Sequence, residues 1–145
     1  MNFEPFDVTL IAQRLRDQIP QLTSVAGVAE FSQIKELRGF RTPSAYVLQA
    51  VEKPGVNGPR GARVQPAQTN FGVAIAVNNY RSEMDASTTD ELRSIVGAVR
   101  TALIGWTPPV PGVTPIGWIG GEVVDFDDNA LLFIDSYQLT NLLQK

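Results

Sequence analysis

An alternating segment at residues 71–77 constrains the fold more than any other part of the chain. Its bulky residues alternate with small ones, in the order Phe71, Gly72, Val73, Ala74, Ile75, Ala76 and Val77. A period of two is typical of a β-strand, and it directs the bulky side chains to one sheet face and the small ones to the other. Because small side chains allow close approach, we expect the helix that follows in sequence to pack across the small face.

Two segments have the 3.6-residue apolar period of an amphipathic helix. The first follows Asp7, the predicted N-cap, and ends before Pro20. The second is predicted to begin at a capping box formed by Thr88 and Glu91 and to end at Gly105. Gly97 lies inside this second helix, where glycine costs about 1 kcal/mol relative to alanine. We therefore predict a close contact at that position.

Further strands are predicted at 25–34, 44–51, 116–126 and 130–139, the last two joined by a turn at 127–129. Three prolines and three glycines at 53–66 indicate an extended loop, and four prolines at 107–115 indicate a stiff connector. The order of elements predicts one α+β domain spanning residues 1–145. We expect a mostly antiparallel mixed sheet of four to five strands, packed against two helices, with two long loops.

Composition excludes large classes of chemistry. The chain contains no cysteine and no histidine, which removes disulfides, cysteine-histidine zinc sites and the Ser-His-Asp triad. Apolar runs such as 131–134 are far shorter than a membrane span. The pattern Asp125-x-Asp127-x-Asn129 begins like a calcium loop, but the required glycine and glutamate are missing from it. We expect no catalytic residues, no cofactor, no metal site and no membrane contact.

Charge is divided unevenly along the chain. The formal net charge is -3, yet residues 1–82 carry nine bases and six acids, whereas residues 83–145 carry three bases and nine acids. This asymmetry could be complementary within one fold, or between neighbouring copies arranged head to tail. Trp106 and Trp118 flank the proline-rich connector, and a small-ligand platform formed by these rings is an alternative to core packing.

Taken in order, several segments resemble the tail terminator proteins of long-tailed bacteriophages, a family that includes tail-completion and minor tail protein U-like members. The likeness begins with the N-terminal helix and continues through the strand entry at 41–47 and the strand at 71–77. The most specific motif is Leu103-x-Gly105-Trp106-x-Pro108, which precedes the C-terminal hairpin.

This resemblance implies a structural protein rather than an enzyme. It implies a ring, usually of six copies, at the head-proximal end of the tail tube, where the ring stops tube polymerisation and offers a docking surface for the head. The implied partners are further copies of the chain, the tail tube protein and a head-tail connector protein, while DNA passes through the ring without specific binding. The implied location is the virion tail, after synthesis in the host cytoplasm.

A ring requires contacts between two different surfaces of each copy. We expect Arg60 and Arg63 on the long loop to contact acids of the next copy, namely Glu122, Asp125, Asp127 and Asp128. A loop that caps the tube is a competing possibility. A head-tail connector or neck protein, a small-ligand-binding module and a carboxylate-based hydrolase are the other functions that the sequence leaves open.

Overall fold

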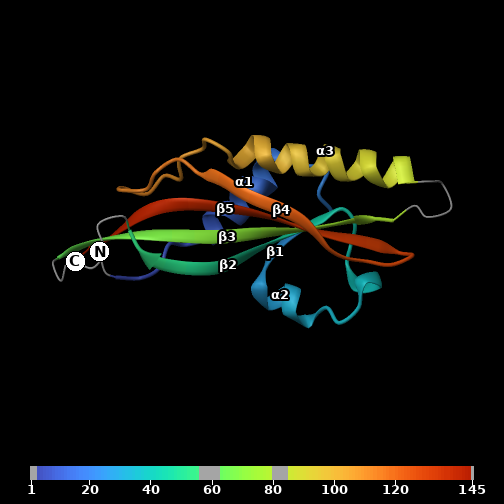
Figure 1. Cartoon of the computed structure of the whole chain (residues 1–145), viewed down its shortest axis with the longest axis horizontal. Coiled ribbons are helices and arrows are strands. Elements are labelled where there is room, and N and C mark those ends of the chain that lie inside the picture. The colour runs from blue at the N-terminus through green and yellow to red at the C-terminus, as the bar shows by residue number, and fades with distance from the viewer. Residues whose placement is uncertain (1–2, 56–62, 80–84, 145) are drawn as a thin grey trace.

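A computed structural model describes residues 3–55, 63–79 and 85–144, with residues 85–89 described by their backbone alone. Along the chain it contains α1 (Thr9–Gln18), β1 (Ser24–Gly27), α2 (Val28–Gln33), a 3-10 turn (Leu37–Gly39), β2 (Ser44–Pro54), β3 (Val64–Asn78), α3 (Asp85–Leu103), β4 (Gly117–Phe126) and β5 (Ala130–Gln144). Figure 1 shows an elongated sheet with α1 and α3 on one side and α2 on the other. The predicted α+β domain with a mixed sheet is confirmed.

The five strands are ordered β1-β2-β3-β5-β4. Only β1 and β2 are parallel, joined by the crossover that contains α2, and every other neighbouring pair is antiparallel. The central pair, β3 and β5, stays in register from Val64 opposite Gln144 to Asn78 opposite Ala130. This long uninterrupted ladder is the rigid axis on which the other elements are arranged (Figure 1).

The bulky side of β3 faces α1 and α3 and forms the main core. Phe71, Val73, Ile75 and Val77 are all at most 1% exposed, and they pack against apolar residues of both long helices. Phe71 stacks on Tyr137 of β5, with ring centroids 5.5 Å apart. Burying large side chains on this face supplies most of the hydrophobic stabilisation.

The small side of β3 is covered by α2 and the 3-10 turn, so the prediction that the following helix packs there is wrong. Ala74 and Ala76 lie in a second cluster with Tyr46, into which Phe31 and Phe40 pack. The three rings lie with centroids 5.5–5.7 Å apart. Large aromatic side chains from a short segment fill the space above the alanines, while α3 needs the bulky face to match its own apolar stripe.

Several predicted boundaries also move. Of the strand predicted at 25–34, only residues 25–27 lie in a strand, as part of β1, because Glu30 accepts the backbone N–H of Gly27 and a short helix starts there. The second long helix begins at Asp85, which places Thr88 inside it rather than at its cap. Val8 rather than Asp7 stands at the N-cap of the first helix, one residue after the predicted position, and the Asp7 carboxylate accepts the N–H of Thr9 at 3.0 Å.

The two predicted loops agree with the structure to different extents. Strands β2 and β3 extend into the loop expected at 53–66, and its centre at 56–62 lies outside the described residues. The connector at 107–115 contains no helix or strand, as predicted, and Val110 and Val113 pack against the main core. Gly105 adopts a φ of 81°, the left-handed conformation that ends α3. None of the described helices is long and apolar enough to cross a membrane.

Candidate assembly surface at the edge of the sheet

Strand β4 forms one edge of the sheet and carries an unusual number of exposed apolar side chains. Every one of its residues is exposed except Gly120, which is half-buried. Its large apolar residues keep between 43% and 66% of their surface open, in the order Trp118, Ile119, Val123, Val124 and Phe126. A cluster of this kind on a sheet edge marks an interaction surface or an aggregation risk.

The backbone of β4 is irregular where it follows β5. Its register shifts between Trp118 and Gly120 and again between Val123 and Asp125, which makes Ile119 and Val124 extra residues in the strand. Gly120 has a φ of 152°. A Cβ on Gly121 would lie 2.6 Å from an oxygen of Asp135, so only glycine allows the strand to approach β5 this closely.

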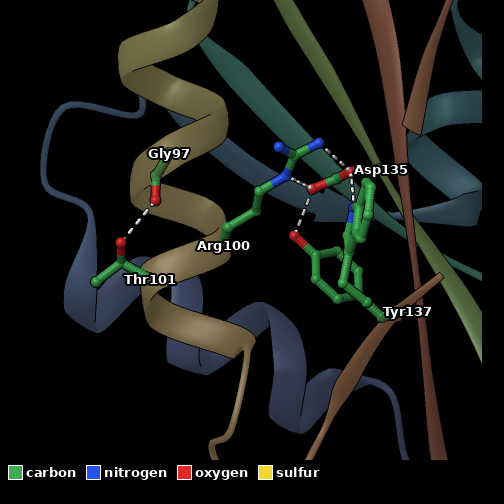
Figure 2. Close-up of polar contacts among 6 residues, drawn as sticks. Gly97, Arg100, Thr101, Asp135 and Tyr137 are labelled. Carbon is green, nitrogen blue, oxygen red and sulfur yellow. Dashed lines mark hydrogen bonds and ion pairs between the residues drawn. The ribbon is translucent and has the colours of Figure 1, made fainter. Parts of the chain in front are cut away.

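A buried carboxylate fastens β4 to the rest of the domain. Asp135 on β5 is fully buried, and Figure 2 shows it between α3 and the sheet. Arg100 of α3 donates from Nε at 2.9 Å and from Nη2 at 3.0 Å. Tyr137 donates its hydroxyl at 2.6 Å, and Trp118 of β4 donates its indole N–H at 2.7 Å. Four donors therefore converge on one carboxylate and satisfy it.

The cluster raises the pKa of both Arg100 and Tyr137, which favours the protonated forms that donate hydrogen bonds to Asp135. The hydrogen bond to Asp135 raises the pKa of Arg100, whose side chain is 35% exposed. Burial, followed by the hydrogen bond to Asp135, raises the pKa of Tyr137 well above its ordinary value. The Arg100 guanidinium also lies 4.8 Å from the centre of the Trp118 ring. The cluster is thus a structural clamp of an ion pair, a phenol and an indole.

A shallow apolar groove lies beside this clamp. It is lined by Leu92, Arg93, Val96, Gly97 and Arg100 of α3 and by Phe133 of β5. Gly97 is exposed, and a Cβ built there would meet nothing within 4 Å. Its carbonyl accepts the hydroxyl of Thr101 at 2.8 Å, as Figure 2 shows. The close contact predicted at Gly97 is therefore not made by any residue in the described part of the chain.

The structure separates the predicted interface residues by the length of the sheet. Arg63 is exposed immediately before β3, and the turn at 127–129 lies at the other end of the same ladder. Fifteen residues at about 3.3 Å each place these two ends roughly 45–50 Å apart. Arg60 lies outside the described residues. Glu122, Asp125, Asp127 and Asp128 are all exposed on or beside the β4–β5 hairpin.

One of these acids, Asp127, also shapes the hairpin. Asp127 accepts the backbone N–H groups of Asn129 and Ala130 at 2.7 and 3.0 Å, which is the predicted turn. An open groove beside the turn is lined by Asp125 and Asp127 of the hairpin and by Lys35, Glu36 and Arg38 from the first half of the sequence. Bases of the first half therefore lie near acids of the second half within one copy. Within 3–55, 63–79 and 85–144, no three acids are grouped so that they could hold a metal ion.

The two tryptophans have separate partners. Trp106 lies against Arg14, with 4.8 Å between the guanidinium carbon and the ring centre, whereas Trp118 lies against Arg100 at the same distance. Trp106 is also packed against the main core. Each ring is held by its own arginine and its own element, which gives the paired-ring platform no support.

The sequence reasoning missed the residues that matter most at this edge. Asp135 stands in an apolar run, and an acid at a core-facing position of a strand is the signal that could have revealed the clamp. Val123 and Phe126 alternate with Glu122 and Asp125, and this pattern predicts a strand with one face in water. In the structure the apolar residues of β4 are exposed as well, which the pattern does not indicate.

Comparisons with known proteins agree with this fold. No sequence among curated proteins matches the chain. Among solved structures, a chain described as the virion of a native gene transfer agent particle is 14% identical, with 91% of each chain covered and a TM-score of 0.61. A likeness at this identity shows the fold alone. A family model described as phage tail terminator protein matches residues 1–145, so the chain belongs to this family and is a structural protein of the virion tail.

Proposed function

We propose that copies of this chain assemble into a ring of six at the head-proximal end of the tail tube. The ring stops tube polymerisation and offers the surface on which the head docks. Its partners are the tail tube protein on one side and a head-tail connector protein on the other, and DNA passes through the ring without specific binding. The protein works by docking and carries out no catalysis.

The observation that carries this proposal is the exposed apolar edge strand. A lone copy leaves the five large apolar side chains of β4 in water, on a strand that the Asp135 clamp holds firmly in place. Burial of such side chains between copies gives about 25 cal/mol for each Å² removed from water. The family membership of the whole chain supports the tail tube as the place of assembly.

The distribution of charge favours contacts between different ends of neighbouring copies. Arg63 and the hairpin acids are too far apart in one copy to interact, because screening weakens exposed charges beyond about 8–10 Å. In a head-to-tail ring, Arg60 and Arg63 of one copy contact Glu122, Asp125, Asp127 or Asp128 of the next. Such pairs add mainly specificity and orientation rather than affinity.

The test is a charge reversal at the basic end. Wild-type protein is expected to give rings of six in native mass spectrometry and to sit at one end of tail tubes in electron micrographs. The double variant Arg60→Glu, Arg63→Glu is expected to remain in smaller species and to leave tubes growing.

Arg16→Glu is the matched control. Arg16 is exposed on α1, donates to the backbone carbonyl of Val25 in its own copy at 2.8 Å and does not line the groove beside the hairpin acids, so its reversal is expected to leave the rings intact. Rings that survive the double reversal would refute the charge contact. Wild-type protein that stays monomeric while tubes lengthen in its presence would refute the function itself.

A further inference from the structure

The two edges of the sheet share a property that its centre lacks. Strands β3 and β5 pair without interruption over fifteen residues. At one edge, β1 is only four residues long, and α2 begins directly after it at Val28. At the other edge, β4 has ten residues, but two register shifts divide it. Neither edge therefore offers a long regular row of backbone groups.

The register shifts cut β4 into three short runs. Residues 117–118, 120–123 and 125–126 pair regularly with β5, whereas Ile119 and Val124 are extra residues, which we call the two bulges. A regular edge strand directs backbone N–H and C=O groups outward at every second residue. Each bulge breaks this period of two. The longest regular run on β4 is thus 120–123, which has the same length as β1.

The break matters because β4 would otherwise be a strong template for strand addition. It has one neighbour in the sheet, it is exposed along nearly its whole length, and its exposed side chains include five large apolar ones. An exposed apolar edge of this kind pairs with strands of other molecules unless something interrupts it. A strand laid along β4 would meet a regular row only over 120–123, and hydrogen-bonding groups left without partners in a contact cost free energy.

Charge is the other feature of β4 that opposes pairing. Glu122 and Asp125 pair with Ile134 and Leu132, so both acids lie on the sheet face that carries α2. Like charges on neighbouring strands are unfavourable. Salt screens exposed charges over about 8–10 Å, whereas a break in a row of hydrogen-bonding groups is not screened. The larger effect is therefore expected from the bulges.

We propose that the bulges at Ile119 and Val124 form a built-in block that keeps β4 from accepting a strand of another copy. Copies that meet at this edge make contact through side chains and do not join into one continuous sheet. The block is a property of the single copy, so it does not depend on the proposed ring.

Deleting the two extra residues tests the block while leaving the rest of the strand in place. In the double deletion of Ile119 and Val124, every remaining residue of β4 is expected to keep its partner on β5 and its sheet face. Trp118 then stays opposite Tyr137 and beside Asp135, and the regular run grows from four residues to eight. The deletion removes two exposed apolar side chains, so stronger association cannot come from added apolar surface.

Isotope-filtered NMR on mixtures of labelled and unlabelled protein provides the measurement. Facing Cα atoms of an antiparallel pair lie only about 4.5–5.5 Å apart, so paired β4 strands of two copies give intermolecular contacts between Hα protons. The double deletion is expected to show these contacts, because several further backbone hydrogen bonds lower the dissociation constant of the pair about tenfold or more. Wild-type protein is expected to show none.

The matched control separates the bulges from the charges. Glu122→Gln, Asp125→Asn removes both acids and keeps both bulges, so it is expected to show no contact between β4 strands. Contacts in this variant would assign the block to charge and overturn the proposal.

Circular dichroism checks that the double deletion folds. Deleting Ile119 or Val124 alone extends the longest regular run to six residues and is expected to give the same contacts more weakly, which keeps the test open if the double deletion does not fold.

The remaining outcomes decide the proposal. Folded deletion variants without contacts between β4 strands would overturn it, and so would such contacts in wild-type protein, whatever the variants do. Native mass spectrometry of wild-type protein reports the ring separately. Absence of rings would refute the proposed function and leave the block standing, and failure of the block would leave the ring standing.

Discussion

Strands β4 and β5 are consecutive, antiparallel and joined by a three-residue turn, yet they have opposite environments. Strand β5 lies between β3 and β4 and buries Ala130, Leu132, Asp135, Tyr137 and Leu139. Strand β4 has one neighbour, two bulges and an open surface along nearly its whole length. Both strands are rich in apolar residues. The difference teaches that β5 holds this domain together, whereas β4 leaves its apolar side chains open to solvent.

The largest expected effect comes from emptying a core position on β5. Leu139 is 2% exposed, and Leu139→Ala is expected to lower the free energy of unfolding by about 2–5 kcal/mol, through lost burial and the cavity left behind. Urea denaturation of the monomer provides the measurement. Phe126→Ala on β4 is the matched comparison and is expected to change stability by less than about 0.5 kcal/mol. Equal losses in the two variants would break the distinction between the strands.

Removing the clamp tests how β4 is attached to β5. Asp135→Ala is expected to cost about 2–4 kcal/mol, because Tyr137 and Trp118 lose their acceptor while Arg100, 35% exposed, can turn to water. Hydrogen exchange is expected to rise more strongly at 117–126 than at 64–78. Glu122→Ala removes an exposed acid from the same edge and serves as the control. Uniform exchange across the sheet would contradict a clamp that acts on β4.

The smallest effect concerns the phenol of the clamp and appears at alkaline pH. The folded state raises the pKa of Tyr137, so it holds this proton more tightly than the unfolded chain does. Its contribution is fully present below the ordinary tyrosine pKa of about 10 and is lost as pH rises above it. Between pH 9 and 11, urea denaturation of wild-type protein is expected to show a loss on the order of 1 kcal/mol.

Tyr137→Phe removes the titrating group and is expected to remove this alkaline loss. Tyr46→Phe leaves Tyr137 in place and is expected to keep it, which makes Tyr46 the matched control. An alkaline loss of the same size in Tyr137→Phe protein would show that the phenol of the clamp does not cause it.

Much of the architecture could be predicted because it depends on local patterns. The alternation at 71–77 predicts β3, and the apolar periods around Leu15 and Val99 predict the two long helices. Asp127 predicts the hairpin turn, because its carboxylate bonds to backbone groups only two and three residues away. These features are decided by residues close together in sequence, and the structure confirms them.

The candidate surface could not be predicted in the same way. Gly97 and Phe133 line one groove although they are far apart in sequence, and Asp135 gathers donors from α3, β4 and β5. The prediction that Arg63 and the hairpin acids belong to one interface stays a proposal, since their separation within one copy tests nothing between copies. The second cluster at Ala74 was assigned to the wrong helix because small residues do not show which element covers them.

By itself the sequence determined most of the long elements and excluded cysteine and histidine chemistry: it contains neither residue, and its apolar residues follow the periods of two and 3.6 residues along these segments. Only the tertiary structure decided which strand stands at the edge, which face each helix covers and which apolar residues remain in water. The physical reason is that the burial of a residue depends on its position in the packed sheet. The order of the strands depends on long-range pairing, which a local sequence pattern does not encode.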